Sequence, residues 1–298
     1  MPKETFPKPE DAVQPEDQES SFEAQFKKTE KYKVAGGTAE VVDIKPEDPK
    51  SEVPVFLAPA WACTTETYRP VLEGLSETDR RIIGINHPRI GGDMNVTPEV
   101  AAQKYPKEEL RKAMNMLGVL DQKGIDKTDV IAHSEGAINT AIAAMLQPEK
   151  FRNIIFYGPA GLIGEDTFTR LLKGFSKQSE PAKSLEGIEI TDDVTNAAKE
   201  ALKYLAKNPV RGMKEAMDIS NSQIHEVLRY LHEKGVGIVV IAGVDDPVFP
   251  MDRIQQIAKK DMLDGFLSVK GGHALLDIHA SAAEKMLTAL EKKEKSPA

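Results

Sequence analysis

Three segments that lie far apart in the chain carry side chains that could together perform nucleophilic catalysis. Ser134 offers a hydroxyl, Asp245 and Asp246 offer adjacent carboxylates, and His273 offers an imidazole. A serine hydroxyl is a weak nucleophile at neutral pH and needs a base that takes its proton as it attacks. A carboxylate can hold that base in the correct tautomer. This set of side chains indicates acyl transfer through a serine.

The residues around Ser134 predict a sharp turn from a strand into a helix. An apolar run precedes Ser134, and a helical pattern follows it. Ala132 and Gly136 stand two residues away on either side, and their small size lets the chain turn without a collision. The amide of Glu135 would then point, with the helix N-terminus, at a negative oxygen beside Ser134. The alternative is that Ser134 only caps the following helix.

The carboxylates and the imidazole also follow predicted strands. An apolar run ends at Gly243, which places Asp245 and Asp246 at the same sheet edge as Ser134. Either aspartate could orient an imidazole, although both could also be ordinary turn residues before a proline. His273 follows a strand-like run and two glycines that give it reach over the sheet edge. The order serine, acid, histidine along the chain favours a catalytic role over an incidental loop histidine.

Alternating strands and helices must position these loops. Short apolar runs are typical of strands buried on both faces, as in a parallel sheet. They cover residues 53–58, 82–85, 129–132, 154–157 and 237–242. Segments with helical spacing lie at residues 66–75, 107–120, 136–146 and 253–260. This alternation predicts an α/β fold with a doubly wound, mostly parallel sheet, whose reactive groups gather beyond the carboxyl ends of the strands.

The remaining segments suggest a core with one insertion and one arm. Residues 31–160 and 236–298 form the predicted core, which opens with an antiparallel hairpin around Gly36 and Gly37. Residues 161–235 show amphipathic stretches and no strand pattern, so we expect a helical cap insertion. The clearest stretches cover residues 168–175, 194–205 and 224–231.

Residues 1–30 are rich in proline and charge, which predicts a flexible acidic arm. An alternative is that Phe22 and Phe26, four residues apart, dock on the body as one helical turn.

These features resemble the α/β-hydrolase family over residues 32–293. The resemblance implies a nucleophile at Ser134, a base at His273 and an acid in a Gly-x-x-Asp loop. Counting from Gly243 places that acid at Asp246, with Asp245 as the fallback.

The resemblance also implies an oxyanion hole in the loop after the first buried strand. Many members read His-Gly and a bulky residue there, whereas this chain reads Pro59-Ala60-Trp61. The match assigns the oxyanion to the amides of Trp61 and Glu135. The first donor stays open, because Ala60 cannot adopt every conformation that glycine allows.

In many relatives a cap covers the site, and the insertion stands in the same place. We therefore expect it to wall an apolar substrate pocket together with the side chains of Trp61, Leu171, Leu172 and Phe175. The alternatives are that Trp61 is a core anchor and that the cap residues only pack on the core.

Other histidines fit structural roles. His133 should point away from Ser134, because neighbouring side chains on a strand face opposite sides. His87 and His279 are expected to be structural. His225 and His232 share a helix face, but no carboxylates at ligand spacing accompany them, so we predict neither a metal nor a cofactor.

Composition narrows partners and compartment. A net charge of -8 and an isoelectric point near 5.4 leave no basic surface for nucleic acid. Cys63 is the one cysteine, which excludes an internal disulfide and favours a reducing compartment. No run reaches the roughly 20 apolar residues of a membrane span, and Met1 to Glu10 lack a secretion signal. These points predict a cytoplasmic protein. Its expected partner, a small-molecule carbonyl substrate, follows from the serine chemistry instead.

The expected reaction is hydrolysis of an ester, thioester or lactone of a small or medium apolar substrate through an acyl-enzyme. Alternatives on the same fold are carbon–carbon bond hydrolysis and acyl transfer to an alcohol. A further alternative is a non-catalytic ligand-binding protein. The presence of all three triad residue types in suitable loops argues against it.

Overall fold

The apolar runs form an eight-stranded sheet in the computed structural model, which describes residues 21–88, 94, 96–178, 203–259, 261–273 and 280–295. The strand order is β1-β2-β4-β3-β5-β6-β7-β8. β2 pairs antiparallel with β1 and β4, and the other pairings are parallel. The strands are β1 (Thr29–Val34), β2 (Gly37–Ile44), β3 (Ser51–Ala58), β4 (Arg80–Asn86), β5 (Thr128–His133), β6 (Phe151–Tyr157), β7 (Gly237–Gly243) and β8 (Gly265–Val269). The predicted α/β class with a mostly parallel sheet is confirmed.

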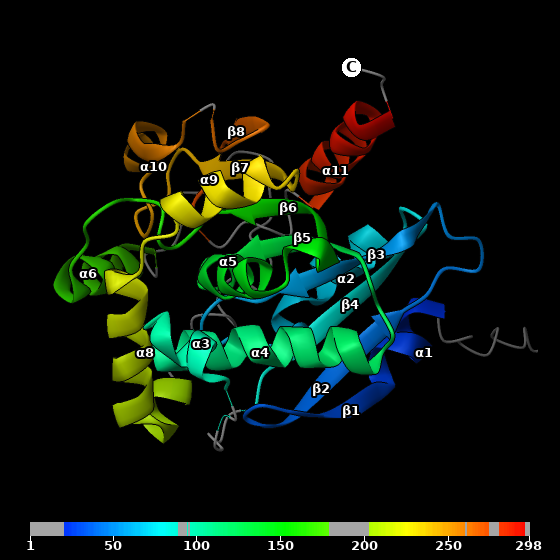
Figure 1. The fold of residues 1–298 in the computed structure, drawn as a ribbon, viewed down its shortest axis with the longest axis horizontal. Helices are drawn as coiled ribbons and strands as arrows, with labels where there is room; N and C mark the ends of the chain where they lie inside the picture. The colour runs from blue at the N-terminus through cyan, green and yellow to red at the C-terminus, as the bar shows by residue number, and fades with distance from the viewer. Residues whose placement is uncertain are drawn as a thin grey trace, which may run out of the picture.

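Helices cover both faces of the sheet (Figure 1). On one face α4 packs on α5 and α5 packs on α9, whereas α2 and α11 lie together on the other. The α-helices are α1 (Ser21–Lys27), α2 (Arg69–Ser76), α3 (Pro98–Ala102), α4 (Lys107–Gln122), α5 (Gly136–Leu146), α6 (Phe168–Gln178), α8 (Pro209–Asn221), α9 (His225–Glu233), α10 (Met251–Ile257) and α11 (Ala280–Lys295). Two 3-10 helices, η1 (Thr65–Tyr68) and η2 (Pro148–Lys150), complete the elements. The apolar strands are buried between the two helix layers.

The chain from Ser21 to Glu30 differs from the expected flexible arm. It forms α1 and the start of β1, and the Phe26 side chain is only 3% exposed. Phe22 stacks on Phe26, and the guanidinium of Arg69 lies over the Phe26 ring. Phe22 and Phe26 thus dock this segment on the body as a helical turn, which is the alternative that their spacing offered. Residues 1–20 lie outside the described residues.

The described part of the segment 161–235 is mainly helical, and its helices pack in two different places. In Figure 1, α6 and α8 lie together at one end of the molecule, far from α1 and α11. By contrast, α9 packs on α5 and β7 and therefore covers the sheet. Of the expected amphipathic stretch at 194–205, residues 194–202 lie outside the described residues.

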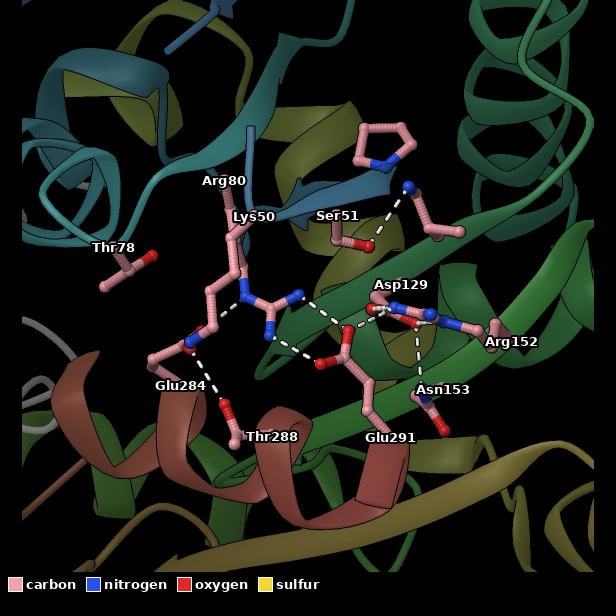
Figure 2. Close-up of polar contacts among 12 residues, drawn as sticks. Lys50, Ser51, Thr78, Arg80, Asp129, Arg152, Asn153, Glu284, Thr288 and Glu291 are labelled. Atoms are coloured by element: carbon pink, nitrogen blue, oxygen red, sulfur yellow. Dashed lines mark hydrogen bonds and ion pairs between the residues drawn. The ribbon is translucent and has the colours of Figure 1, made fainter. Parts of the chain in front are cut away.

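A buried ion network fastens α11 to the amino ends of the central strands (Figure 2). The guanidinium of Arg80, the first residue of β4, is fully buried and donates to both carboxylate oxygens of Glu291 at 2.8 and 2.9 Å. Its Nε donates to Glu284 at 2.7 Å. Arg152 of β6 donates to Glu291 at 2.6 Å and also pairs with Asp129 of β5. One carboxylate on α11 therefore joins two strands that do not neighbour each other in the sheet.

The network is required because a buried guanidinium without a partner is costly. Hydrogen bonds from Arg80 lower the pKa of Glu291 to about 2 against the opposing effect of burial, so this carboxyl stays ionised. Glu291 therefore holds its charge throughout the neutral range.

Replacing Glu291 by Gln should lower the free energy of unfolding by about 3 kcal/mol, because it removes the carboxylate that the buried Arg80 shares with Arg152 and leaves Arg80 with Glu284 alone. Urea denaturation at neutral pH measures this difference. Glu294→Gln is the matched control, since Glu294 lies exposed on the same helix, and it should change stability by less than about 0.5 kcal/mol.

The loss should also depend on pH. A folded-state pKa below the ordinary 4.5 means that ionised Glu291 stabilises the fold above that pH, and the contribution disappears as pH falls towards 2. The gap between wild type and Glu291→Gln should therefore narrow over this range. A gap that stays constant would contradict the assigned ion pair.

Candidate active site

Three loops at the carboxyl edge of the sheet bring Ser134, Asp246 and His273 together. Ser134 follows β5, Asp246 follows β7 and His273 follows β8. The Nε2 atom of His273 lies 2.9 Å from Ser134 Oγ, and its Nδ1 atom lies 2.8 Å from Asp246 Oδ2. All three residues are buried. The imidazole thus bridges a hydroxyl and a carboxylate across 139 and 27 residues of chain, respectively.

Ser134 occupies a strained turn between β5 and α5. Its φ of 56° lies in the left-handed region, where residues other than glycine are rare. A Cβ at Gly136 would come within 2.4 Å of the Ala58 carbonyl oxygen, so the helix can begin there only with glycine. The helix start receives no side-chain cap bond from its N-cap residue, Glu135. The Ser134 hydroxyl lies beside His273, and the simple capping role is not observed.

The loop after β7 distinguishes the two candidate acids. Asp246 is buried, and its Oδ1 accepts hydrogen bonds from the amides of Val248 and Phe249 at 2.7 and 2.9 Å. These bonds leave Oδ2 facing His273. Asp245 is exposed to solvent. The structure therefore gives the contact with the imidazole to Asp246.

His133 lies next to Ser134 in sequence yet contacts the backbone of His273. Its Nε2 lies 2.9 Å from the His273 carbonyl oxygen, which can only accept, so this nitrogen carries the proton. Its Nδ1 then accepts from the hydroxyl of Tyr68 at 2.7 Å, and that hydroxyl accepts from the Ala60 amide at 2.8 Å. Burial, together with the nearby His273, lowers the pKa of His133 to about 3 and keeps it neutral. This chain of hydrogen bonds joins the loop after β8, which carries His273, to the loop after β3, which carries Ala60.

The loop after β3 carries the first predicted oxyanion donor. Gly136 of the elbow packs directly on Ala58 and Pro59, so this loop and the elbow are in contact. The positive φ of the loop falls on Ala62, at 60°, rather than on Ala60. The glycine of the family pattern is therefore dispensable at position 60.

Aromatic side chains surround the imidazole. Phe249 and Phe175 have ring centroids 5.1 and 6.3 Å from that of His273, and Trp61 lies 5.9 Å from Phe175. Of the expected pocket residues, Trp61 and Phe175 thus lie at the site. Leu171 is fully buried in the core, and Leu172 is 41% exposed.

Sequence reasoning missed several of these neighbours. Phe249 stands three residues after Asp246 and packs beside His273. Its place in the loop of the acid was the one sequence feature that could have indicated this contact. Nothing in the sequence pointed to Tyr68, because its partner His133 lies 65 residues away.

The remaining histidines do not gather. His225 and His232 have a nearby carboxylate each, from Glu226 and Asp264. The described ranges contain no group of three or more potential metal ligands. The segment 89–93 and His279 lie outside the described residues.

None of the described helices has the length and hydropathy of a membrane span.

Comparisons with known proteins identify the fold family of the chain. The sequence matches the family described as having the alpha/beta hydrolase fold over residues 53–280. No curated protein matches the sequence.

Three solved structures of low identity share the fold. A serine hydrolase from Cycloclasticus zankles is 16% identical with a TM-score of 0.62, and the match covers 91% of this chain and 99% of that one. An esterase from Exiguobacterium antarcticum is 15% identical with a TM-score of 0.62, over 88% and 98%. A meta-cleavage product hydrolase from Pseudomonas fluorescens is 14% identical with a TM-score of 0.59, over 89% and 98%.

The family match covers well over half of the chain and includes the segments that carry Ser134, Asp246 and His273. The three structures share the fold over 88–91% of this chain. The chain is therefore an alpha/beta hydrolase, a member of the family that carries the alpha/beta hydrolase fold.

Proposed function

We propose that this enzyme is a serine hydrolase that cleaves an ester, thioester or lactone of a small or medium apolar substrate through an acyl-enzyme. The observation that carries the proposal is the imidazole of His273, 2.9 Å from the Ser134 hydroxyl and 2.8 Å from the Asp246 carboxylate. Nucleophile, base and orienting acid are thus within hydrogen-bond reach of one another.

In the first step Ser134 Oγ attacks the substrate carbonyl carbon while His273 Nε2 takes the hydroxyl proton. Asp246 accepts a hydrogen bond from Nδ1 and stabilises the imidazolium that forms. The tetrahedral intermediate then collapses, and His273 returns the proton to the leaving group. In the second step His273 takes a proton from the water that attacks the acyl carbon, and it returns this proton to Ser134 Oγ as the carboxylic acid leaves.

The negative oxygen of each tetrahedral intermediate requires fixed donors. We assign this role to the amides of Trp61 and Glu135, which lie in the two loops that touch at Gly136. The N-terminus of α5 adds a favourable dipole at the same place. Loss of one such donor typically reduces the rate by about 10²–10³.

The choice of an apolar substrate rests on the aromatic rings beside His273. Trp61 and Phe175 provide apolar surface from the oxyanion loop and from the cap, respectively. Carbon–carbon bond hydrolysis is a second candidate, because one structure with this fold is named a meta-cleavage product hydrolase. The same three side chains would serve it.

Ser134→Ala should abolish turnover of short- and medium-chain p-nitrophenyl esters, with a loss of at least about 10³-fold, because it removes the attacking atom. It should also abolish covalent labelling by a fluorophosphonate probe, read as a mass increase on Ser134 of the wild type. Wild-type enzyme that neither labels nor turns over any ester would favour a binding role. Label on a different residue would reject the assigned nucleophile.

Asp246→Asn should lower kcat by about 10³–10⁴, because an amide no longer fixes the histidine tautomer that the reaction needs. Asp245→Asn is the matched control, since Asp245 is exposed in the same loop and should retain nearly full activity. Steady-state kinetics with one ester compares the two variants. A greater loss from the Asp245 change would overturn the assignment of the acid.

A further inference from the structure

A buried lysine lies behind the proposed oxyanion hole. Lys112 of α4 is almost excluded from solvent, and its ammonium donates to Glu135 at 2.5 Å. The second carboxylate within reach is that of Glu215 on the cap helix α8, at 3.6 Å. Glu135 is the residue that directly follows Ser134. The ammonium therefore connects the nucleophile elbow with the cap.

Glu215 in turn holds the side chain of Trp61. The indole Nε1 of Trp61 donates to Glu215 Oε2 at 2.9 Å, and the hydroxyl of Tyr204 donates to the same oxygen at 2.7 Å. The other carboxylate oxygen accepts from Arg211 at 3.1 Å. The Tyr204 ring also packs edge-on against the indole. A single cap carboxylate thus fixes the orientation of the one tryptophan in the chain.

Two members of this cluster, Lys112 and Glu215, keep their charges. Burial favours a neutral amine at Lys112, but the carboxylates of Glu135 and Glu215 raise the pKa of Lys112 above its usual value. Burial likewise opposes the ionised form of Glu215, yet Lys112 and the hydrogen bonds from Tyr204 and Trp61 lower the pKa of Glu215. The ion pair between Lys112 and Glu215 therefore persists despite its burial.

The cluster lies directly against the oxyanion loop. A cavity of about 50 Å³ is lined by Ala60 and Ala62, which flank Trp61, and also by Lys112, Glu135 and Glu215. The side chains of Trp61 and Glu135, whose amides we assign to the oxyanion, are thus both connected to the Lys112 ammonium. Glu135 contacts it directly, and Trp61 does so through Glu215.

We propose that Lys112 and Glu215 are positioning residues that hold the Trp61 and Glu135 amides in one fixed geometry. Donors stabilise an oxyanion only when they are already aimed at its position, and an error of a few tenths of an ångström weakens them. The inference rests on the proposed function. It makes the cap part of the catalytic geometry, because α8 supplies the carboxylate that orients the oxyanion loop.

Trp61→Phe tests the proposal with the smallest change, because it deletes the indole N–H and keeps an aromatic ring against Phe175. We expect kcat for a p-nitrophenyl ester to fall about 10-fold while KM changes less than twofold. The inhibition constant of a trifluoromethyl ketone, which forms an oxyanion adduct with the serine, should rise by the same factor. A purely structural role would leave that inhibition constant unchanged.

Glu215→Gln and Glu215→Leu extend the test to the cap. Gln retains an acceptor for the indole and should keep more of the activity than Leu does. The double variant Trp61→Phe/Glu215→Leu should lose little more than Glu215→Leu alone, because both changes break the same bond. Asp43→Asn is the matched control, since Asp43 is a buried carboxylate paired with Arg81 at the start of β4, whereas the oxyanion loop follows the end of the parallel strand β3. It should lower Tm and leave kcat unchanged.

The outcomes separate this inference from the proposed function. If Ser134 is labelled and Trp61→Phe keeps wild-type kcat and inhibition, the cluster only docks the cap and the inference is wrong, while the serine mechanism stands. The inference is likewise wrong if the effects of Trp61→Phe and Glu215→Leu are additive. If Glu215→Leu fails to fold, Trp61→Phe decides the question. If wild type is not labelled at Ser134, the proposed function fails and the inference falls with it.

Discussion

The position of one imidazole constrains the rest of the molecule. The ring of His273 must face a hydroxyl from one strand end and a carboxylate from another, with a tolerance set by the length of a hydrogen bond. Parallel strands end at the same edge of the sheet, so β5, β7 and β8 deliver all three groups to one place. The strained backbone of Ser134 is tolerated because the surrounding packing leaves no other arrangement.

Two buried polar systems support that arrangement from opposite sides of the serine. His133 and Tyr68 link the carbonyl of His273 to the amide of Ala60 through neutral hydrogen bonds. Lys112 and Glu215 link the elbow to α8 through charges. Buried polar groups are tolerated only when each has a partner, so both systems are sensitive to the loss of any member. The site is consequently held by side chains that do not touch the reacting atoms.

The sequence predicted the sheet well, because apolar runs bounded by turns reflect burial directly. It predicted the three triad loops for the same reason, since each follows such a run. It failed where contacts are distant: Glu215 meets Trp61 across 154 residues, and no local pattern records this. The sequence offered Leu171 and Leu172 equally for the pocket, whereas the structure buries Leu171 and leaves Leu172 41% exposed. The order of α1 corresponds to the alternative that the spacing of Phe22 and Phe26 offered, whereas the composition of residues 1–30 as a whole favoured a flexible arm.

The pairing of Arg80 with Glu291 has a consequence for how the chain acquires its structure. The two residues are separated by 211 positions, so nearly the entire sheet is translated before the helix that neutralises the guanidinium leaves the ribosome. Until α11 docks, Arg80 has neither Glu284 nor Glu291 as its acceptor. Burying its guanidinium would then be costly, so the amino ends of the central strands cannot exclude water. Docking of α11 is therefore a condition for the dry packing of this end of the sheet, although the helix supplies none of the residues at the active site.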